Sequence, residues 1–198
     1  MINFEGMKAE ERKQGYPMLP AGGYVAKITN VKIDGQAPDQ SLVLRVDVIE
    51  GEQAGYFMKR YNHDKEGSGK YPARYKGDYW LRIPNRNNTK ALYPESDIKR
   101  FNGALWAIES SNPGYHFSGN EKELIGKIVG INMQEGTYND APYTVIGQLE
   151  KADDVREGKV KLMRPRKPRG DQQAAEPAAA SMDPSGFTPV EVGDSLPF

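Results

Sequence analysis

The sequence predicts a mainly β fold, a small Greek-key barrel that has one long helix and a disordered C-terminal tail. Several short segments alternate apolar and polar residues, which is the pattern of strands buried on one side. One long segment repeats its apolar residues every three or four positions, as an amphipathic helix does. The tail is rich in Ala, Gln, Pro and Ser and has too few large apolar residues to build a core.

The first three predicted strands lie between residues 23 and 61. Residues 23–33 are rich in β-branched and aromatic side chains, and the turn formers Asp34 and Gly35 follow them. Residues 41–50 alternate well, with four aliphatic side chains on one face. Residues 56–61 are predicted to form the third strand.

A long polar loop or hairpin is expected at residues 63–77, which are glycine-rich, and the next strand at residues 79–83. Residues 95–110 form the long helix, and Asn112, Pro113 and Gly114 end it. Its apolar stripe consists of Ile98, Phe101, Leu105 and Ile108.

The second half of the chain predicts a short helix at residues 121–125 and strands at residues 127–134, 142–150 and 159–163. Strands, then a helix, then further strands is the order of an OB-fold, a small Greek-key barrel. Other small barrels and sandwiches fit the same pattern, so the periodicity alone supports only a small β-barrel.

Composition divides the chain into four parts. Residues 1–20 are an irregular segment, residues 21–163 the barrel domain, residues 164–190 a basic run followed by a low-complexity linker, and residues 191–198 an apolar tip. All 27 Lys and Arg residues lie at or before Arg169, whereas five of the 27 acidic residues follow Gly170. The body is therefore basic and the tail acidic, which favours a polyanionic partner for the body.

Several classes of protein are excluded by composition. The 198 residues include no cysteine and two histidines, which excludes disulfide scaffolds, thiolate zinc sites and histidine-rich metal sites. No cluster of carboxylates or histidines indicates catalysis, so we expect no enzyme, no metal and no cofactor. No apolar run reaches the roughly 20 residues that span a bilayer, and the charged first residues are unlike a signal peptide. A cytoplasmic protein without membrane contact is the expectation.

The strongest functional signal lies at residues 56–90, which hold nine basic residues, three acids and seven aromatic rings. Single-stranded nucleic acid needs this mixture, because phosphates bind cations and unstacked bases bind flat rings. Strand alternation would group Phe57, Lys59 and Tyr61 on one face, and Trp80 with Arg82 on another. The alternative is that the rings fill the core and the charges are solvated. The candidate nucleic-acid-binding residues are Phe57, Lys59, Arg60, Tyr61, Lys70, Tyr71, Arg74, Tyr75, Lys76, Trp80, Arg82 and Arg86.

The C-terminus, which reads Leu196-Pro197-Phe198 after Asp194, resembles that of bacterial and phage single-stranded-DNA-binding proteins. Members of this family end in an acidic, disordered tail with a short hydrophobic tip. Residues 19–27 and 48–56 also look like segments of phage DNA-binding proteins with OB-like cores. This chain departs from the family pattern in that Glu191 and Asp194 alone supply acid near the tip.

The resemblance implies that the Phe198 side chain and carboxylate dock in a pocket with a basic rim on replication, recombination or repair proteins. Leu196, Pro197 and Asp194 would belong to the same contact. The function expected is sequence-independent binding and protection of single-stranded DNA, without catalysis, by a monomer or homo-oligomer. The alternatives are a phage adaptor or inhibitor that binds a host protein and mimics a host tail, and a small nuclease.

Overall fold

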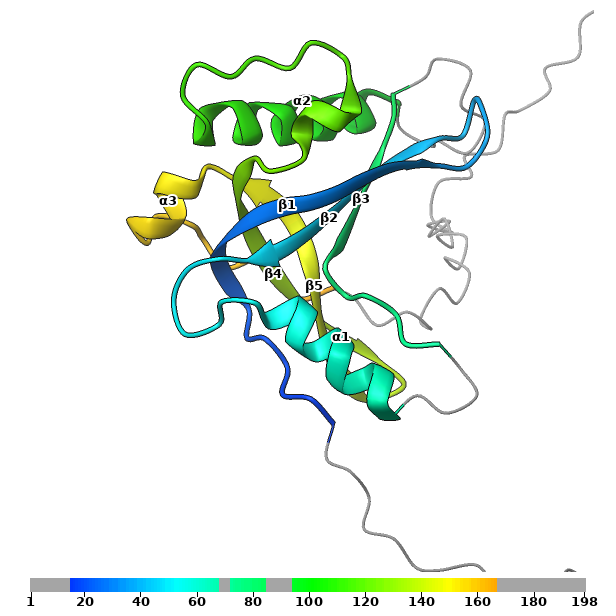
Figure 1. The fold of residues 1–198 in the computed structure, drawn as a ribbon, viewed down its shortest axis with the longest axis vertical. Helices are drawn as coiled ribbons and strands as arrows, with labels where there is room; N and C mark the ends of the chain where they lie inside the picture. Colours follow the sequence, from blue (N-terminus) through cyan, green and yellow to red (C-terminus); the bar gives the residue numbers. More distant parts are fainter. Residues whose placement is uncertain (1–14, 68–71, 85–93, 167–198) are drawn as a thin grey trace, which may run out of the picture.

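The fold of the protein is given by a computed structural model, which describes residues 15–67, 72–84 and 94–166 (Figure 1). Within these residues the structure is mainly β, as predicted, with one five-stranded sheet and a few helices. The elements are β1 (Gly22–Asp34), β2 (Ser41–Val48), α1 (Tyr56–Gly67), β3 (Asp78–Arg82), α2 (Pro94–Ser111), η1 (Glu121–Leu124), β4 (Ile128–Tyr138), β5 (Ala141–Glu150) and α3 (Ala152–Arg156).

The sheet is antiparallel throughout, in the order β3-β2-β1-β4-β5. β1 is its long central strand: the first half pairs with β4 and the second half with β2. A bulge between Ile28 and Asn30 bends β1 where it passes from one partner to the other, and bulges increase the local twist. The sheet thus curls, and no pairing joins β3 to β5 in the described part of the chain.

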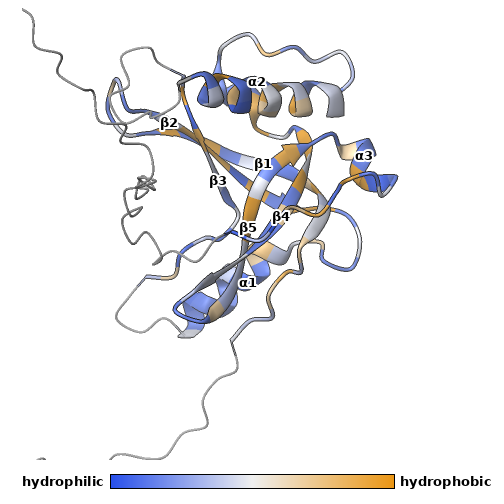
Figure 2. Ribbon diagram, turned by 180° about the vertical axis from the view of Figure 1, so that it is seen from behind, coloured by the Kyte–Doolittle hydropathy of each residue, from blue (hydrophilic) through white to orange (hydrophobic). Residues whose placement is uncertain are grey.

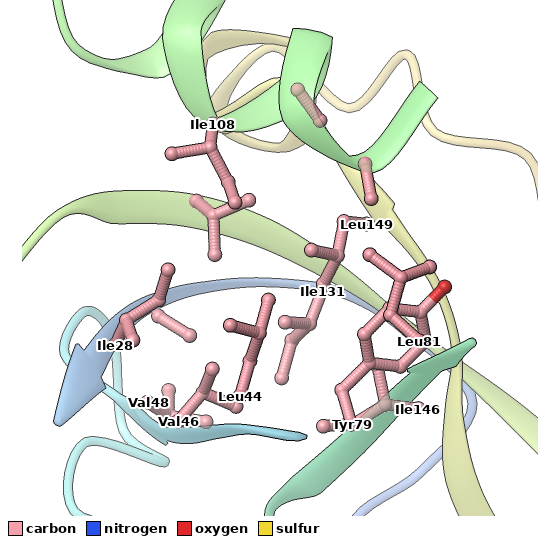
Figure 3. Close-up of a cluster of buried hydrophobic side chains, with 14 of the residues drawn as sticks. Ile28, Leu44, Val46, Val48, Tyr79, Leu81, Ile108, Ile131, Ile146 and Leu149 are labelled. Carbon is pink, nitrogen blue, oxygen red and sulfur yellow. The ribbon is translucent and has the colours of Figure 1, made fainter. Parts of the chain in front are cut away.

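Alternating residues of the strands fill the space inside this curl. Leu44 and Val46 of β2, Tyr79 of β3, and Ile28 and Ile131 of β1 and β4 point toward one another in Figure 3. The α2 helix covers one end of the curl and α1 the other (Figure 1). In Figure 2 the strands carry much of the apolar colour. The core therefore lies between the sheet and these two helices.

The prediction of a third strand at residues 56–61 is wrong, because the segment begins α1. The carboxylate of Asp47 accepts hydrogen bonds from the backbone N–H groups of Val48 and Phe57, both at 2.9 Å, and so caps the new helix. Gly55 supplies the turn into the helix with a φ of 76°. Only Tyr56 and Phe57 of α1 are buried, so the sequence carries no helical repeat of apolar residues that would reveal it.

Residues 159–163 do not form the predicted strand either. They follow the outside of β4, where the side chains of that strand hold their backbone. The Asn132 amide donates to the carbonyl of Lys161 at 3.0 Å, and the Gln134 amide donates to that of Arg164 at 2.7 Å. Side chains thus replace the ladder that a sixth strand would provide.

The cap on α1 predicts a specific stability loss. Asp47→Ala removes the acceptor for the Phe57 N–H, and we expect a loss of about 1–2 kcal/mol in the free energy of unfolding, measured in urea. Asp47→Asn retains an acceptor oxygen, and burial raises the pKa of the Asp47 carboxyl, so the neutral amide suits this position. Asn should therefore cost clearly less than Ala. Equal losses for the two variants would contradict the capping role.

Candidate nucleic-acid interface

A groove with a volume of about 1070 Å³ follows β3 and reaches across to β5; we call it the β3 groove. Cations and aromatic rings dominate its lining, and Asp78 is its one acid among the described residues. The cations are Arg45, Arg74, Lys76, Arg100 and Arg166. The rings are those of Tyr61, Tyr75 and Trp80. Residues from β2, α1, β3, α2 and the segment after α3 thus converge on one hollow.

Trp80 occupies the outer face of β3. Tyr79 and Leu81 are buried on the inner face, so the alternation of the strand directs Trp80 outward, as predicted, and its side chain is 50% exposed. The sheet register aligns Trp80 with Val43 of β2 and Lys32 of β1. The Lys32 Nζ atom lies 5.6 Å from the centre of the Trp80 ring. The half-exposed indole can stack on a base, and the Lys32 ammonium, which also contacts the Asp34 carboxylate at 3.3 Å, lies near enough to bind the adjoining phosphate.

Tyr75 forms a fixed wall of the groove. Its hydroxyl donates to the carbonyl of Val46 at 2.9 Å, and burial raises the pKa of Tyr75, so the phenol stays protonated. The Arg45 guanidinium lies 4.6 Å from the centre of the Tyr75 ring and forms a bidentate pair with Asp78, at 2.8 and 3.0 Å. The Tyr61 ring lies 5.9 Å from that of Tyr75. These contacts hold two rings and one guanidinium in place before any ligand arrives.

The cations of the groove differ in how far they are already neutralised. Arg45 is paired with Asp78, whereas Arg100 and Arg166 are fixed by hydrogen bonds to neutral groups, the Tyr79 hydroxyl at 3.2 Å and the Gln134 side chain at 2.9 Å, which leave their charge in place. Arg74 and Lys76 are exposed and form no ion pair with any residue that the structure describes. Their charge is the part of the groove most available to an incoming phosphate.

Of the predicted binding residues, Tyr61, Arg74, Tyr75, Lys76 and Trp80 line the β3 groove. Arg82 shares the outer face of β3 and lies 3.8 Å from Asp97 of α2. Lys59 and Arg60 lie elsewhere on α1; the Lys59 ammonium donates to the carbonyl of Ala54. Lys70, Tyr71 and Arg86, and Asp194, Leu196, Pro197 and Phe198 of the tip, lie outside the described residues.

Phe57 requires a correction, because its side chain is 1% exposed and belongs to the core. Phe57 is the second residue of α1, and its side chain packs in the core, with its ring 5.3 Å from that of Tyr56 and 6.2 Å from that of Tyr75. The ring cannot reach a base. Truncating it would leave a cavity and act on stability, by about 3–5 kcal/mol for a buried Phe.

Sequence reasoning missed Arg45, Arg100 and Lys32, and it left open whether the basic run that contains Arg166 is a linker or a phosphate contact. Arg45 faces outward from an alternating strand, but its place beside Asp78 depends on the pairing of β2 with β3. Arg166 belongs to a basic run that reads equally well as linker or as phosphate contact. Its backbone N–H donates to Glu135 and its guanidinium to Gln134, which brings it to the groove.

Comparison with known proteins assigns no function to the β3 groove, so its function is inferred from its geometry. Neither a protein-family model nor a curated protein sequence matches the chain. Within the described ranges, no group of three or more His, Asp or Glu residues is placed to hold a metal ion. No helix in those ranges has both the length and the apolar character to cross a bilayer.

The electrostatic character of the groove predicts selective quenching of tryptophan fluorescence. The chain has two tryptophans, so Trp106→Phe leaves Trp80 as the sole reporter and Trp80→Phe leaves Trp106. A positive potential concentrates anions, so at low salt iodide should quench Trp80 more than caesium does. Trp106, one helical turn from Glu109, should show a smaller preference for iodide. Equal iodide-to-caesium ratios for the two reporters would argue against a basic groove at Trp80.

Proposed function

We propose that the protein binds single-stranded DNA without catalysis and largely independently of sequence, with the strand lying in the β3 groove. The observation that carries this proposal is the convergence on one hollow of five cations and three rings, among them the half-exposed ring of Trp80. Cations neutralise the phosphates, and rings accept any base because every base has a π face. Bases paired inside a duplex cannot stack on Trp80, so the groove suits an unpaired strand.

The topology of the open, curled sheet supports the proposal of an OB-fold. A closed OB-fold opened between its third and fifth strands has the strand order β3-β2-β1-β4-β5, with the principal helix between the third and fourth strands, as α2 is here. OB-folds bind oligonucleotides on the face of their second and third strands. Arg45 of β2 and Trp80 of β3 belong to that face in this chain.

The biological role that fits such binding is protection of single strands during phage DNA replication or recombination. On this proposal residues 191–198 bind replication, recombination or repair proteins. The charge split supports this division, because the body is basic and the tail is acidic and ends in an apolar tip. The barrel holds the nucleic acid, and the tip holds the protein partner.

A second candidate is an adaptor that binds another protein through the barrel. The observation in its favour is that α2 exposes two large apolar residues, Ile98 at 43% and Trp106 at 57%. Exposed tryptophans are common at the centre of protein interfaces. Neither residue lines the β3 groove, so substitutions on the two surfaces separate the candidates.

Trp80→Ala should weaken binding to oligo-dT by about 1–3 kcal/mol, because a stacking ring is lost. Fluorescence anisotropy of a labelled oligonucleotide measures the dissociation constant. Trp106→Ala is the matched control, because it removes an equally exposed indole outside the groove and should leave the dissociation constant unchanged. Unchanged binding by Trp80→Ala would reject the groove, and loss by Trp106→Ala alone would move the interface to α2.

The unpaired cations predict the salt dependence of binding. Each phosphate contact on a single strand contributes about 0.7 to the slope of log K against log salt concentration. Arg74→Ala and Lys76→Ala should each lower that slope by about this amount. Lys59→Ala is the control, because the ammonium of Lys59 bonds to Ala54 away from the groove. If all three variants changed the slope equally, the charge effect would be general and not local.

A further inference from the structure

A second hollow, with a volume of about 370 Å³, adjoins the β3 groove and shares Lys76 and Val145 with it. We call it the Arg60 hollow, because Arg60 is the cation that it does not share with the groove. The other residues used here are Tyr16 from the segment before β1 and Tyr143 from β5. The two hollows therefore meet at Lys76 and Val145.

Arg60 has hydrogen-bonding capacity that the protein leaves unused. Its Nη1 donates to the hydroxyl of Tyr56 at 3.1 Å, and its nearest carboxylate, that of Asp64, lies 3.8 Å from Nε. The Nε atom is buried and has no hydrogen-bond partner among the residues that the structure describes. The guanidinium carries five N–H donors and the Arg60 side chain is 24% exposed, so donors that reach the hollow can bind an anionic ligand.

The remaining walls of the Arg60 hollow are fixed by contacts with the rest of the fold. The end of the Tyr143 ring packs against Gly136, where a Cβ would lie 2.5 Å from the ring. The Tyr16 ring lies edge-on to Tyr56, with 5.5 Å between the centroids. The hydroxyl of Thr144 donates to the carbonyl of Leu19 at 2.8 Å, which ties the segment before β1 to β5. The hollow is thus preformed, with two partly buried phenol rings beside two cations.

We propose that the Arg60 hollow binds the continuation of the strand held in the β3 groove, with a phosphate between Arg60 and Lys76 and a nucleotide against Tyr143. This inference rests on the proposed function, and it extends the footprint of the nucleic acid from β3 around to the start of β5. The ligand class is a nucleoside phosphate, either within a strand or free.

The test measures affinity for oligo-dT of increasing length, over the range of about 4–16 nucleotides that single OB-folds occlude. The Arg60→Met variant keeps the apolar stem of the side chain and removes its charge. The shortest oligonucleotides that bind, which fill only the groove, should bind this variant as they bind the wild type. Longer ones should lose about tenfold, because a hydrogen bond to a charged group is lost.

Tyr143→Leu provides a second, independent variant and should give the same length dependence, so a folding defect in one variant does not end the test. Lys59→Met, at the neighbouring position of α1, is the matched control and should behave as wild type at every length. Losses that are equal at all lengths, or absent at all lengths, would overturn the inference. The inference would also be overturned if thymidine monophosphate bound only when Arg60 was present while Arg60→Met left the affinity for long oligonucleotides unchanged. The hollow would then bind a free nucleotide and not the strand.

Trp80→Ala, measured in the same series, separates the two proposals. If Trp80→Ala weakens binding at every length and the Arg60 and Tyr143 variants have no effect, only the second hollow is rejected. If Trp80→Ala has no effect at any length, the β3 groove itself is rejected as the binding surface.

Discussion

The inward packing of β3 determines what its outer face presents. Tyr79 and Leu81 are buried against β2 and α2, and because side chains alternate along a strand, Trp80 must then face outward. A shift of one residue in the pairing with β2 would bury Trp80 together with the charges of Asp78 and Arg82, at a large cost in free energy. The stability of the core thus secures the position of the most exposed ring in the groove.

Gly77 connects the core to the groove just before β3 begins. A Cβ at this position would lie 2.5 Å from the Val46 carbonyl oxygen and within 2.8 Å of the rings of Phe57 and Tyr75. The Gly77 carbonyl in turn accepts the Val46 N–H at 2.9 Å. The absence of a side chain therefore lets the backbone pass between a core ring and a groove ring. Close packing of this kind is why Tyr75 and Arg45 stay in fixed positions.

Patterns that extend along one element were predictable from the sequence. The alternation of β2 predicted a strand and the apolar spacing of α2 predicted a helix, and the structure confirms both, although Ile98 of the predicted apolar stripe is 43% exposed. The α1 helix was not predictable, because only residues of its first turn are buried and because the side chain that caps it, Asp47, belongs to strand β2. The sequence likewise indicated a basic and aromatic region. The burial of Phe57 and the position of Arg166 beside the β3 groove, however, depend on contacts between segments that are distant in the sequence. Such contacts leave no periodic signal.

The attachment of residues 159–166 along β4 affects how the two proposed functions, DNA binding and partner binding, are arranged in space. Asn132 and Gln134 anchor this segment, so the chain continues toward residues 191–198 from Arg166, in the wall of the β3 groove. A partner bound at those residues would be tethered to the sheet through Arg166, which lines the β3 groove. Tethering two binding modules raises the effective concentration of one near the other. Transfer of the DNA strand from the β3 groove to that partner would then take place within one complex.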